Sequence, residues 1–262
     1  MMNRIQQTMS HCLVQKEKAL ACFLTAGFPT PEELFPLVGA LERGGADIIE
    51  LGMPFSDPLA DGPVIQHSSH IALQQGVTLE WILTQVRLIR NRSNIPIVLM
   101  GYLNPIMAYG SSNFFTDAAS AGVDGFILPE LPLEESDRFL DLFKANNLAN
   151  ILLVTPTTMP SRIALIDKQS NGFLYCVSTT GVTGSLKNRM DTSYIKKVKT
   201  SAKKNPVLVG FGIKTVEDAR HAVRTADGVI IGSALIELIG KGKSLAAIES
   251  FVRGIKTGMK TQ

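Results

Sequence analysis

The stretch Asp47-Ile-Ile-Glu-Leu-Gly-Met-Pro-Phe-Ser-Asp-Pro-Leu-Ala-Asp61 decides how this chain is expected to fold. It starts as an apolar run and continues as a loop that is rich in Pro, Ser and Asp. A short, nearly continuous apolar run is typical of a strand in a parallel sheet that is buried on both faces. The same unit, an apolar run followed by a turn and a helical pattern, is repeated along the sequence.

Eight such units, each of about 33 residues, have the spacing of a closed (β/α)8 barrel. The runs that predict strands are residues 20–25, 47–52, 96–100, 125–129, 151–155, 173–177, 207–210 and 228–231. The patterns that predict helices are residues 31–43, 79–90, 113–121, 133–145, 160–168, 192–203, 216–223 and 245–255. A polar segment before the first run, residues 3–15, predicts an additional N-terminal helix.

The alternative architecture is an open, doubly wound sheet. Such a sheet usually has fewer strands, and it often carries a Gly-x-Gly-x-x-Gly turn after the first strand, which this chain lacks there. No linker interrupts the units. The sequence therefore predicts an α/β fold, a (β/α)8 TIM barrel, as a single domain over residues 1–262.

Composition narrows the functional class. The net charge of +3 is mild, and aromatic residues make up 6% of the chain, so no nucleic-acid interface is expected. No apolar run reaches the length of a membrane span, and no signal peptide is evident, so we expect a cytoplasmic protein without a membrane partner. The three cysteines have no metal-ligand spacing and fit a reducing compartment.

Two carboxylates stand out at the second strand, because barrel enzymes place their chemistry where strands end. Glu50 interrupts an apolar run, and a charge there is costly unless it is paired or functional. An apolar setting also raises the pKa of a carboxyl, which suits acid and base catalysis. The structural alternative for Glu50 is a salt bridge. For Asp61 the alternative is a role in forming a turn, although Asp57 could also take that role because it precedes a proline.

Glycine-rich segments follow three later strands and suggest a phosphate site. They are residues 181–185, 210–213 and 232–234, and the last opens a short helical stretch. Phosphate-binding barrels commonly use the loops after strands seven and eight together with a helix N-terminus. Simple turn chemistry is the alternative. Phe23, Tyr175 and Phe211 lie at or near strand ends and would fit a flat apolar substrate.

Two kinds of aldolase are disfavoured by missing residues. None of the predicted strands contains a lysine, which argues against a Schiff base. His67 and His70 would share a helix face, but no third ligand is evident, so surface positions are expected and no metal.

The motif from Glu50 to Pro63 resembles the signature of the tryptophan synthase alpha chain family. Segments 100–106, 177–184 and 210–213 resemble the same family, and the resemblance covers nearly the whole chain. It implies a (β/α)8 barrel that is a carbon–carbon lyase of tryptophan biosynthesis. The reaction would be retro-aldol cleavage of indole-3-glycerol phosphate to indole and glyceraldehyde 3-phosphate.

The resemblance also implies roles for single residues. It places the catalytic Glu and Asp at Glu50 and Asp61, with Tyr175 beside the catalytic Glu, and the aromatic residues of the indole pocket at Phe23 and Phe211. The phosphate-binding groups correspond to Gly184, Gly212, Gly232 and Ser233. A lid corresponds to residues 179–190, from which Thr183 would reach Asp61 on closure.

A partner is implied in the same way. Family members usually form an αββα complex and pass indole to a beta chain that carries pyridoxal phosphate, so no cofactor is expected in this chain. The surface that faces the beta chain corresponds to Pro54, Asp57, Pro58, Asn104 and Pro105. One departure is Glu130, where the family often has Asp, and this residue is left out of the predicted site.

Two other readings stay open from the residues alone. Another phosphate-binding barrel, such as an isomerase or the synthase that closes the indole ring, could use similar glycine loops. That synthase would need a catalytic strand lysine, which is missing here. A non-catalytic subunit that binds a phosphorylated ligand and regulates a partner would not need Glu50, Asp61 and Tyr175 together.

Overall fold

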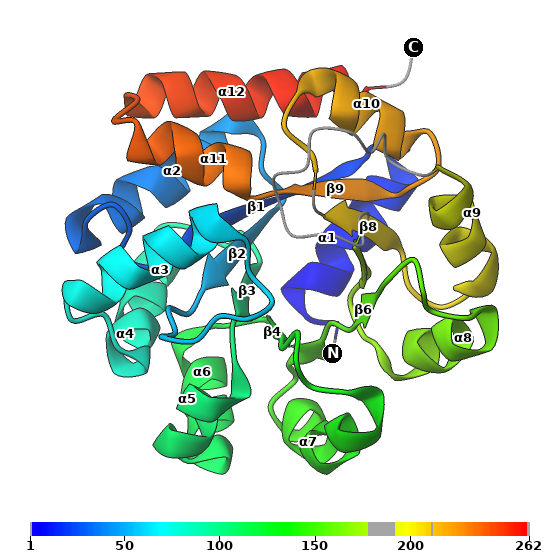
Figure 1. Ribbon diagram of the computed structural model, residues 1–262, viewed down its shortest axis with the longest axis horizontal. Coiled ribbons are helices and arrows are strands. Elements are labelled where there is room, and N and C mark those ends of the chain that lie inside the picture. The colour runs from blue at the N-terminus through cyan, green and yellow to red at the C-terminus, as the bar shows by residue number, and fades with distance from the viewer. Residues whose placement is uncertain (1, 178–191, 211, 261–262) are drawn as a thin grey trace.

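The structure is a computed structural model that describes residues 2–177, 192–210 and 212–260. Its strands form one parallel sheet in the order β5-β4-β3-β2-β1-β9-β8-β7-β6, surrounded by helices (Figure 1). The strands are β1 (Ala19–Thr25), β2 (Ile48–Gly52), β3 (Ile97–Met100), β4 (Gly125–Ile127), β5 (Ala149–Asn150), β6 (Leu153–Val154), β7 (Leu174–Val177), β8 (Val207–Gly210) and β9 (Gly228–Ile231).

The two edges of this sheet, β5 and β6, are consecutive in the chain, and this connection closes the barrel. β5 pairs with β4, and β6 pairs with β7. Between them, the Ile151 amide donates to the Phe126 carbonyl (3.0 Å), and the Leu152 carbonyl accepts from the Tyr175 amide (3.0 Å). One extended segment therefore changes partners halfway along. The predicted fifth strand, residues 151–155, is wrong in its bounds: the segment starts at Ala149 and divides into two short strands.

Helices cover the outside of the barrel. They are α1 (Arg4–Val14), α2 (Leu34–Gly44), α3 (Pro63–Gln74), α4 (Leu79–Arg90), α5 (Leu103–Tyr109), α6 (Ser111–Ala121), α7 (Leu133–Ala145), α8 (Pro160–Gln169), α9 (Thr192–Ser201), α10 (Val216–Val223), α11 (Ser233–Gly240) and α12 (Leu245–Gly258), with a 3-10 turn η1 (Pro31–Glu33) before α2. The (β/α)8 prediction and the additional N-terminal helix are confirmed. α3 and α5 were not predicted as elements of the barrel, and both follow strands that carry site residues.

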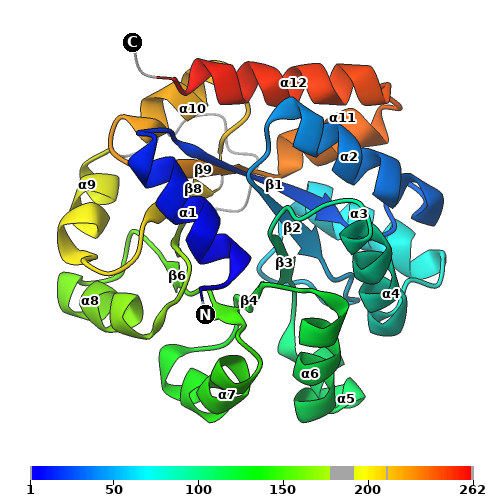
Figure 2. The same ribbon diagram turned by 180° about the vertical axis from the view of Figure 1, so that it is seen from behind.

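Helix α1 lies across the end of the barrel where the strands begin, and Figure 2 shows it in front of the strands when the molecule is seen from behind. Buried Asp124, which precedes β4, accepts hydrogen bonds from Arg4 and Arg90 (both 2.8 Å) and from the Ile97 amide (2.8 Å). Asn3 forms a capping box at the start of α1 and donates to the Asp124 carbonyl (3.1 Å). These bonds close the end of the barrel that is opposite to the strand ends.

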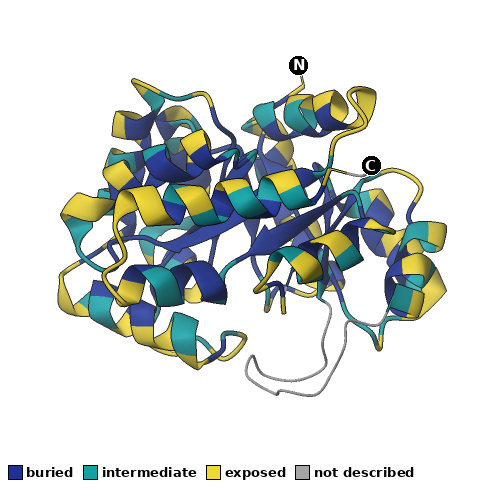
Figure 3. Ribbon diagram, turned by 90° about the horizontal axis from the view of Figure 1, so that it is seen from above, coloured by how far each residue is buried: buried dark blue, intermediate teal, exposed yellow. Residues whose placement is uncertain are grey.

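The hydrophobic core fills the barrel and the layer between strands and helices. All residues of β1, β2 and β3 are buried, while the helices expose only their outward faces (Figure 3). This agrees with the near-continuous apolar runs in the sequence. Glu50 is in register with Phe23 on one side and Val98 on the other. The barrel therefore carries a carboxyl group into its apolar interior near the end of β2.

Candidate active site

A pocket opens at the carboxyl ends of the strands. Its lining comes from widely separated parts of the chain: Phe23, Glu50, Asp61, Gly62, Ile65, Met100, Tyr175, Gly212, Ile213, Ile230, Gly232 and Ser233. The structure thus brings together seven of the predicted site residues. Thr183, Gly184, Phe211 and the predicted lid at residues 179–190 lie outside the described residues.

Glu50 is completely buried in this pocket. Within the part of the chain that the structure describes, neither of its carboxyl oxygens has a hydrogen-bond partner. Burial raises the pKa of Glu50 to about 8. Among the residues that the structure describes, Glu50 therefore forms no salt bridge, and its raised pKa keeps the group protonated near neutral pH.

Asp61 also lines the pocket, from the loop between β2 and α3. Its amide donates to the Pro58 carbonyl (3.0 Å), and its carbonyl accepts from Gln66 on the first turn of α3 (3.0 Å). The pKa of Asp61 is raised to about 6, mainly by burial. A hydrogen bond from Tyr102 lowers this pKa, and the charge of Glu130 raises it. Asp61 is thus ionised at neutral pH, where Glu50 is protonated.

Tyr102 is a site residue that the sequence reasoning missed. Its hydroxyl group is 3.0 Å from Oδ2 of Asp61 and 3.0 Å from the Ala60 amide. Tyr102 follows β3 after one intervening residue, Gly101, and is buried. The rule that strand ends carry the chemistry could have found it, since it stands two residues after Met100, but its side chain also suits a core position.

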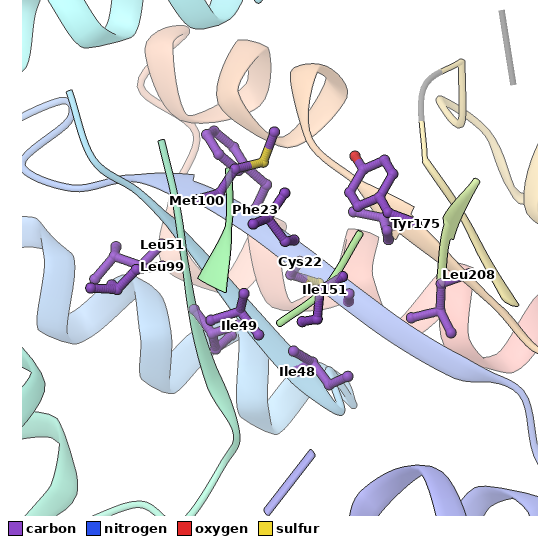
Figure 4. Close-up of a cluster of buried hydrophobic side chains, with 14 of the residues drawn as sticks. Cys22, Phe23, Ile48, Ile49, Leu51, Leu99, Met100, Ile151, Tyr175 and Leu208 are labelled. Carbon is purple, nitrogen blue, oxygen red and sulfur yellow. The ribbon is translucent and has the colours of Figure 1, made fainter. Parts of the chain in front are cut away.

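Two aromatic side chains form apolar walls of the pocket. Figure 4 shows Phe23 with Met100 at one end of the buried cluster, and Tyr175 across from them. Both rings lie against a glycine of the neighbouring strand. A Cβ atom on Gly52 would be 2.5 Å from the Phe23 ring, and a Cβ atom on Gly210 would be 2.3 Å from the Tyr175 hydroxyl oxygen. The two glycines therefore allow the rings to approach the neighbouring strands this closely.

We expect Gly210→Ala to lower kcat/KM for the pocket's substrate by about ten- to a hundredfold, because the Tyr175 ring must move into the pocket and misplace the ligand. Steady-state kinetics would measure the change. Gly254→Ala is the matched control, since a Cβ atom there would meet only one side-chain atom of Val216, at 4.0 Å. Equal kcat/KM in Gly210→Ala and the wild type would show that the Tyr175 position does not matter.

Two glycines and a serine at the start of a helix also line the pocket. Gly212 has a positive φ of 80°, and Gly232 is the N-cap of α11, with Ser233 as its first residue. The N-terminus of a helix carries free N–H groups and a partial positive charge. Together these groups fit an anionic part of a ligand, such as a phosphate.

The histidines and cysteines take no part in this pocket. His67 and His70 are exposed on α3, as predicted, and Cys12, Cys22 and Cys176 are buried free thiols. Within residues 2–177, 192–210 and 212–260, no three His, Cys, Asp or Glu side chains are arranged to hold a metal ion. In the same residues, no helix is both long and apolar enough to cross a membrane.

A buried carboxyl, Glu50, and a half-buried one, Asp61, differ in pKa and lie in one pocket with aromatic walls and a helix N-terminus, in agreement with the family suggested by the sequence motifs. The family model described as tryptophan synthase alpha chain matches residues 9–260. The chain belongs to the tryptophan synthase alpha chain family. It is accordingly a lyase of tryptophan biosynthesis that cleaves indole-3-glycerol phosphate to indole and glyceraldehyde 3-phosphate.

Individual relatives agree over the full length. The tryptophan synthase alpha chain of Geotalea uraniireducens is 45% identical over 99% of this chain and 98% of the relative. A tryptophan synthase alpha chain structure from Legionella pneumophila is 38% identical, covers 99% of this chain and 98% of its own, and has a TM-score of 0.90. A tryptophan synthase structure from Mycobacterium tuberculosis is 32% identical, with full coverage of both chains and a TM-score of 0.91.

The residues predicted to face a beta chain of tryptophan synthase lie outside the pocket lining. Asp57 and Asn104 are exposed, Pro58 and Pro105 are partly exposed, and Pro54 is buried. Pro54 can therefore shape this surface but offers little of its own side chain to a partner. The neighbouring apolar side chains Leu59 and Met107 are 92% and 57% exposed.

Glu130 has a role next to this surface. Its carboxylate accepts a hydrogen bond from the Leu103 amide, at the first turn of α5. It is not one of the residues that line the pocket, yet its charge raises the pKa of Asp61. The Glu130 side chain thus holds the first turn of the helix that follows Tyr102.

Proposed function

We propose that Glu50 is the acid and base of the alpha reaction, and that Asp61 stabilises the charge that develops on the indole ring. The observation that carries this proposal is the fully buried Glu50 carboxyl group, which lines the same pocket as Asp61 and has no hydrogen-bond partner among the described residues. A group in this state has its proton available for a ligand.

The reaction then proceeds in two proton transfers. Protonated Glu50 gives its proton to C3 of the indole ring, which forms an iminium-like tautomer with positive charge at the ring nitrogen. Ionised Asp61 accepts a hydrogen bond from that N–H and stabilises the charge. Glu50, now ionised, removes the proton from the adjacent glycerol hydroxyl. The C–C bond breaks, its electron pair returns to the ring, and indole and glyceraldehyde 3-phosphate are released.

The apolar setting of Glu50 suits both steps, because one carboxyl must act first as an acid and then as a base near neutral pH. Phe23 would hold the indole ring by an apolar wall, together with Phe211. Tyr175 would lie beside Glu50, and burial with the nearby Glu50 and Asp61 charges raises its pKa, so it stays a neutral donor. The phosphate would bind at Gly212, Gly232 and Ser233, together with Gly184, and Thr183 in a lid at residues 179–190 would close over Asp61.

We propose the assembly in the same way. The chain is one barrel domain over residues 1–262 and works in the cytoplasm as part of an αββα complex. The partner is a tryptophan synthase beta chain, which would hold pyridoxal phosphate, and this chain needs no cofactor. The surface formed by Pro54, Asp57, Pro58, Asn104 and Pro105 would receive the beta chain, so that indole passes to it.

The purified chain should be incubated with indole-3-glycerol phosphate, alone and with a beta chain, and both products measured. We expect indole and glyceraldehyde 3-phosphate in equal amounts, with a faster rate when the beta chain is present, because closure of the pocket excludes water and completes the site. Tight binding of the substrate without either product, in both conditions, would instead identify a binding subunit and contradict the proposal.

A further inference from the structure

Tyr102 holds the loop between β2 and α3 at both of its ends. The centroid of its ring lies 5.2 Å from that of the Phe55 ring, near the start of that loop, and the two ring planes are inclined at 32°. Its hydroxyl group bonds the Ala60 amide and the Asp61 carboxylate, at the end of the loop. The side chain is 6% exposed, so its place is fixed by packing. A single residue after β3 thus sets where Asp61 stands.

The direction of these hydrogen bonds can be deduced. A backbone N–H can only donate, so the Tyr102 oxygen accepts from Ala60. The single hydroxyl proton is then free to point at the Asp61 carboxylate, 3.0 Å away. A hydroxyl that donates to a carboxylate stabilises its ionised form, which is the form that the proposed mechanism needs.

Tyr102 also lies between the two segments proposed to face the beta chain. The first contains Phe55, which contacts the Tyr102 ring, and the second is α5, for which Tyr102 is the N-cap. The Glu130 carboxylate holds the Leu103 amide next to it. A partner that displaces either segment would therefore move the Tyr102 ring or its backbone, and with it the hydroxyl that bonds Asp61.

We infer that Tyr102 is a positioning residue for Asp61, and that it transmits contact at the partner-facing surface to the active site. The inference rests on the proposed function, since it takes the role of Asp61 and the place of the beta chain from it. Contiguous packed side chains of this kind can carry coupling between two sites, provided that the coupling is then demonstrated.

The test is Tyr102→Phe, which keeps the ring against Phe55 and removes both hydrogen bonds. We expect kcat for indole-3-glycerol phosphate cleavage to fall about ten- to a hundredfold, because a charge-assisted bond is lost, with little change in KM. Tyr102 and Glu130 shift the pKa of Asp61, and the other titratable groups that line the same pocket are Tyr175 and Glu50. Only the first lowers its pKa by a hydrogen bond, so the low-pH limb of the kcat profile should move to higher pH in the variant.

The matched control is Tyr109→Phe, which removes a Tyr–Asp hydrogen bond of 2.8 Å to Asp117 at the other end of α5. It should leave kcat, the pH profile and the stimulation by the beta chain unchanged. In Tyr102→Phe, the ratio of kcat with and without the beta chain should decrease at least twofold. Unfolding curves of both variants would show whether either change acts through stability.

The outcomes separate the two proposals. A wild-type chain that releases no product with or without a beta chain overturns the proposed function itself. An active wild type together with a Tyr102→Phe variant of the same kcat and pH profile overturns the positioning role alone. If Tyr102→Phe shifts the pH profile of kcat but leaves the ratio of kcat with and without the beta chain unchanged, the positioning role stands. The transmission of partner contact is then overturned.

Discussion

Replacing Glu50 with Gln is expected to lower kcat for indole-3-glycerol phosphate cleavage by about 10³- to 10⁴-fold. Gln has nearly the same shape but can neither give a proton to C3 of indole nor remove the glycerol hydroxyl proton, and both steps depend on this group. Because the variant still fills the pocket, KM should change little. Rapid quench of single turnovers would measure the chemical step directly.

The same substitution is expected to stabilise the fold at high pH. Burial raises the pKa of Glu50 to about 8, whereas an unfolded chain has the ordinary value of 4.5. The folded state therefore binds the proton more tightly, so the stability that Glu50 contributes is complete below about pH 4.5 and is lost as the pH rises through about 8. Between these two pH values the free energy of unfolding of the wild type falls by on the order of 4–5 kcal/mol through this group. The Gln variant has no group that titrates there, so its stability does not fall in this way.

Thermal unfolding at pH 5 and pH 9 would check this second effect. The wild type should lose stability relative to Glu50→Gln between the two pH values. Glu33→Gln is a suitable control, because this glutamate is exposed and lies outside the pocket. Either substantial turnover in Glu50→Gln, or a stability difference that does not depend on pH, would contradict the assignment of Glu50.

The sequence predicted most strands because each is a buried apolar run bounded by turns. It could not show where the barrel closes. Hydrogen-bond partners leave no local pattern, so the division of residues 149–154 between β4 and β7 is visible only in three dimensions. Helix α5 was not predicted, and Pro105 stands in its first helical turn, where a missing N–H costs nothing.

The candidate site residues also differed in how well the sequence predicted them, because only a residue that is unusual in its local sequence stands out. Glu50 is chemically out of place in an apolar run, so it was evident from the residues alone. Asp61 in a Pro-rich loop had only the surrounding motif in its favour, because loops commonly contain Asp. Tyr102 gave no signal of its own, since a buried Tyr after a strand is ordinary. Its role depends on two hydrogen bonds to a loop that is 41 and 42 residues away in sequence.

Replacing Asp61 with Asn is expected to lower kcat about 10³-fold while the fold stays intact. The amide oxygen can still accept a hydrogen bond from the indole N–H, but it has no negative charge to stabilise the developing cation, which is the larger effect in a buried site. Burial raises the pKa of Asp61 to about 6, whereas its ordinary value is 3.8. The stability that this group contributes to the wild-type fold is therefore lost as the pH rises from about 3.8 through 6. Asn avoids that loss, and Asp61→Asn should be at least as stable as the wild type at pH 7.

The protonation states of Asp61 and Glu50 together predict how kcat of the wild type depends on pH. Cleavage needs Asp61 ionised and Glu50 protonated, so kcat should be highest between about pH 6 and 8, where the pKa values of the two carboxyls place both in the required form. In Asp61→Asn the residual activity should keep its decline above pH 8 and lose its decline below pH 6. Asp141→Asn, on the exposed face of α7, should keep both limbs. A low-pH limb that persists in Asp61→Asn would assign that limb to another group and remove Asp61 from its electrostatic role.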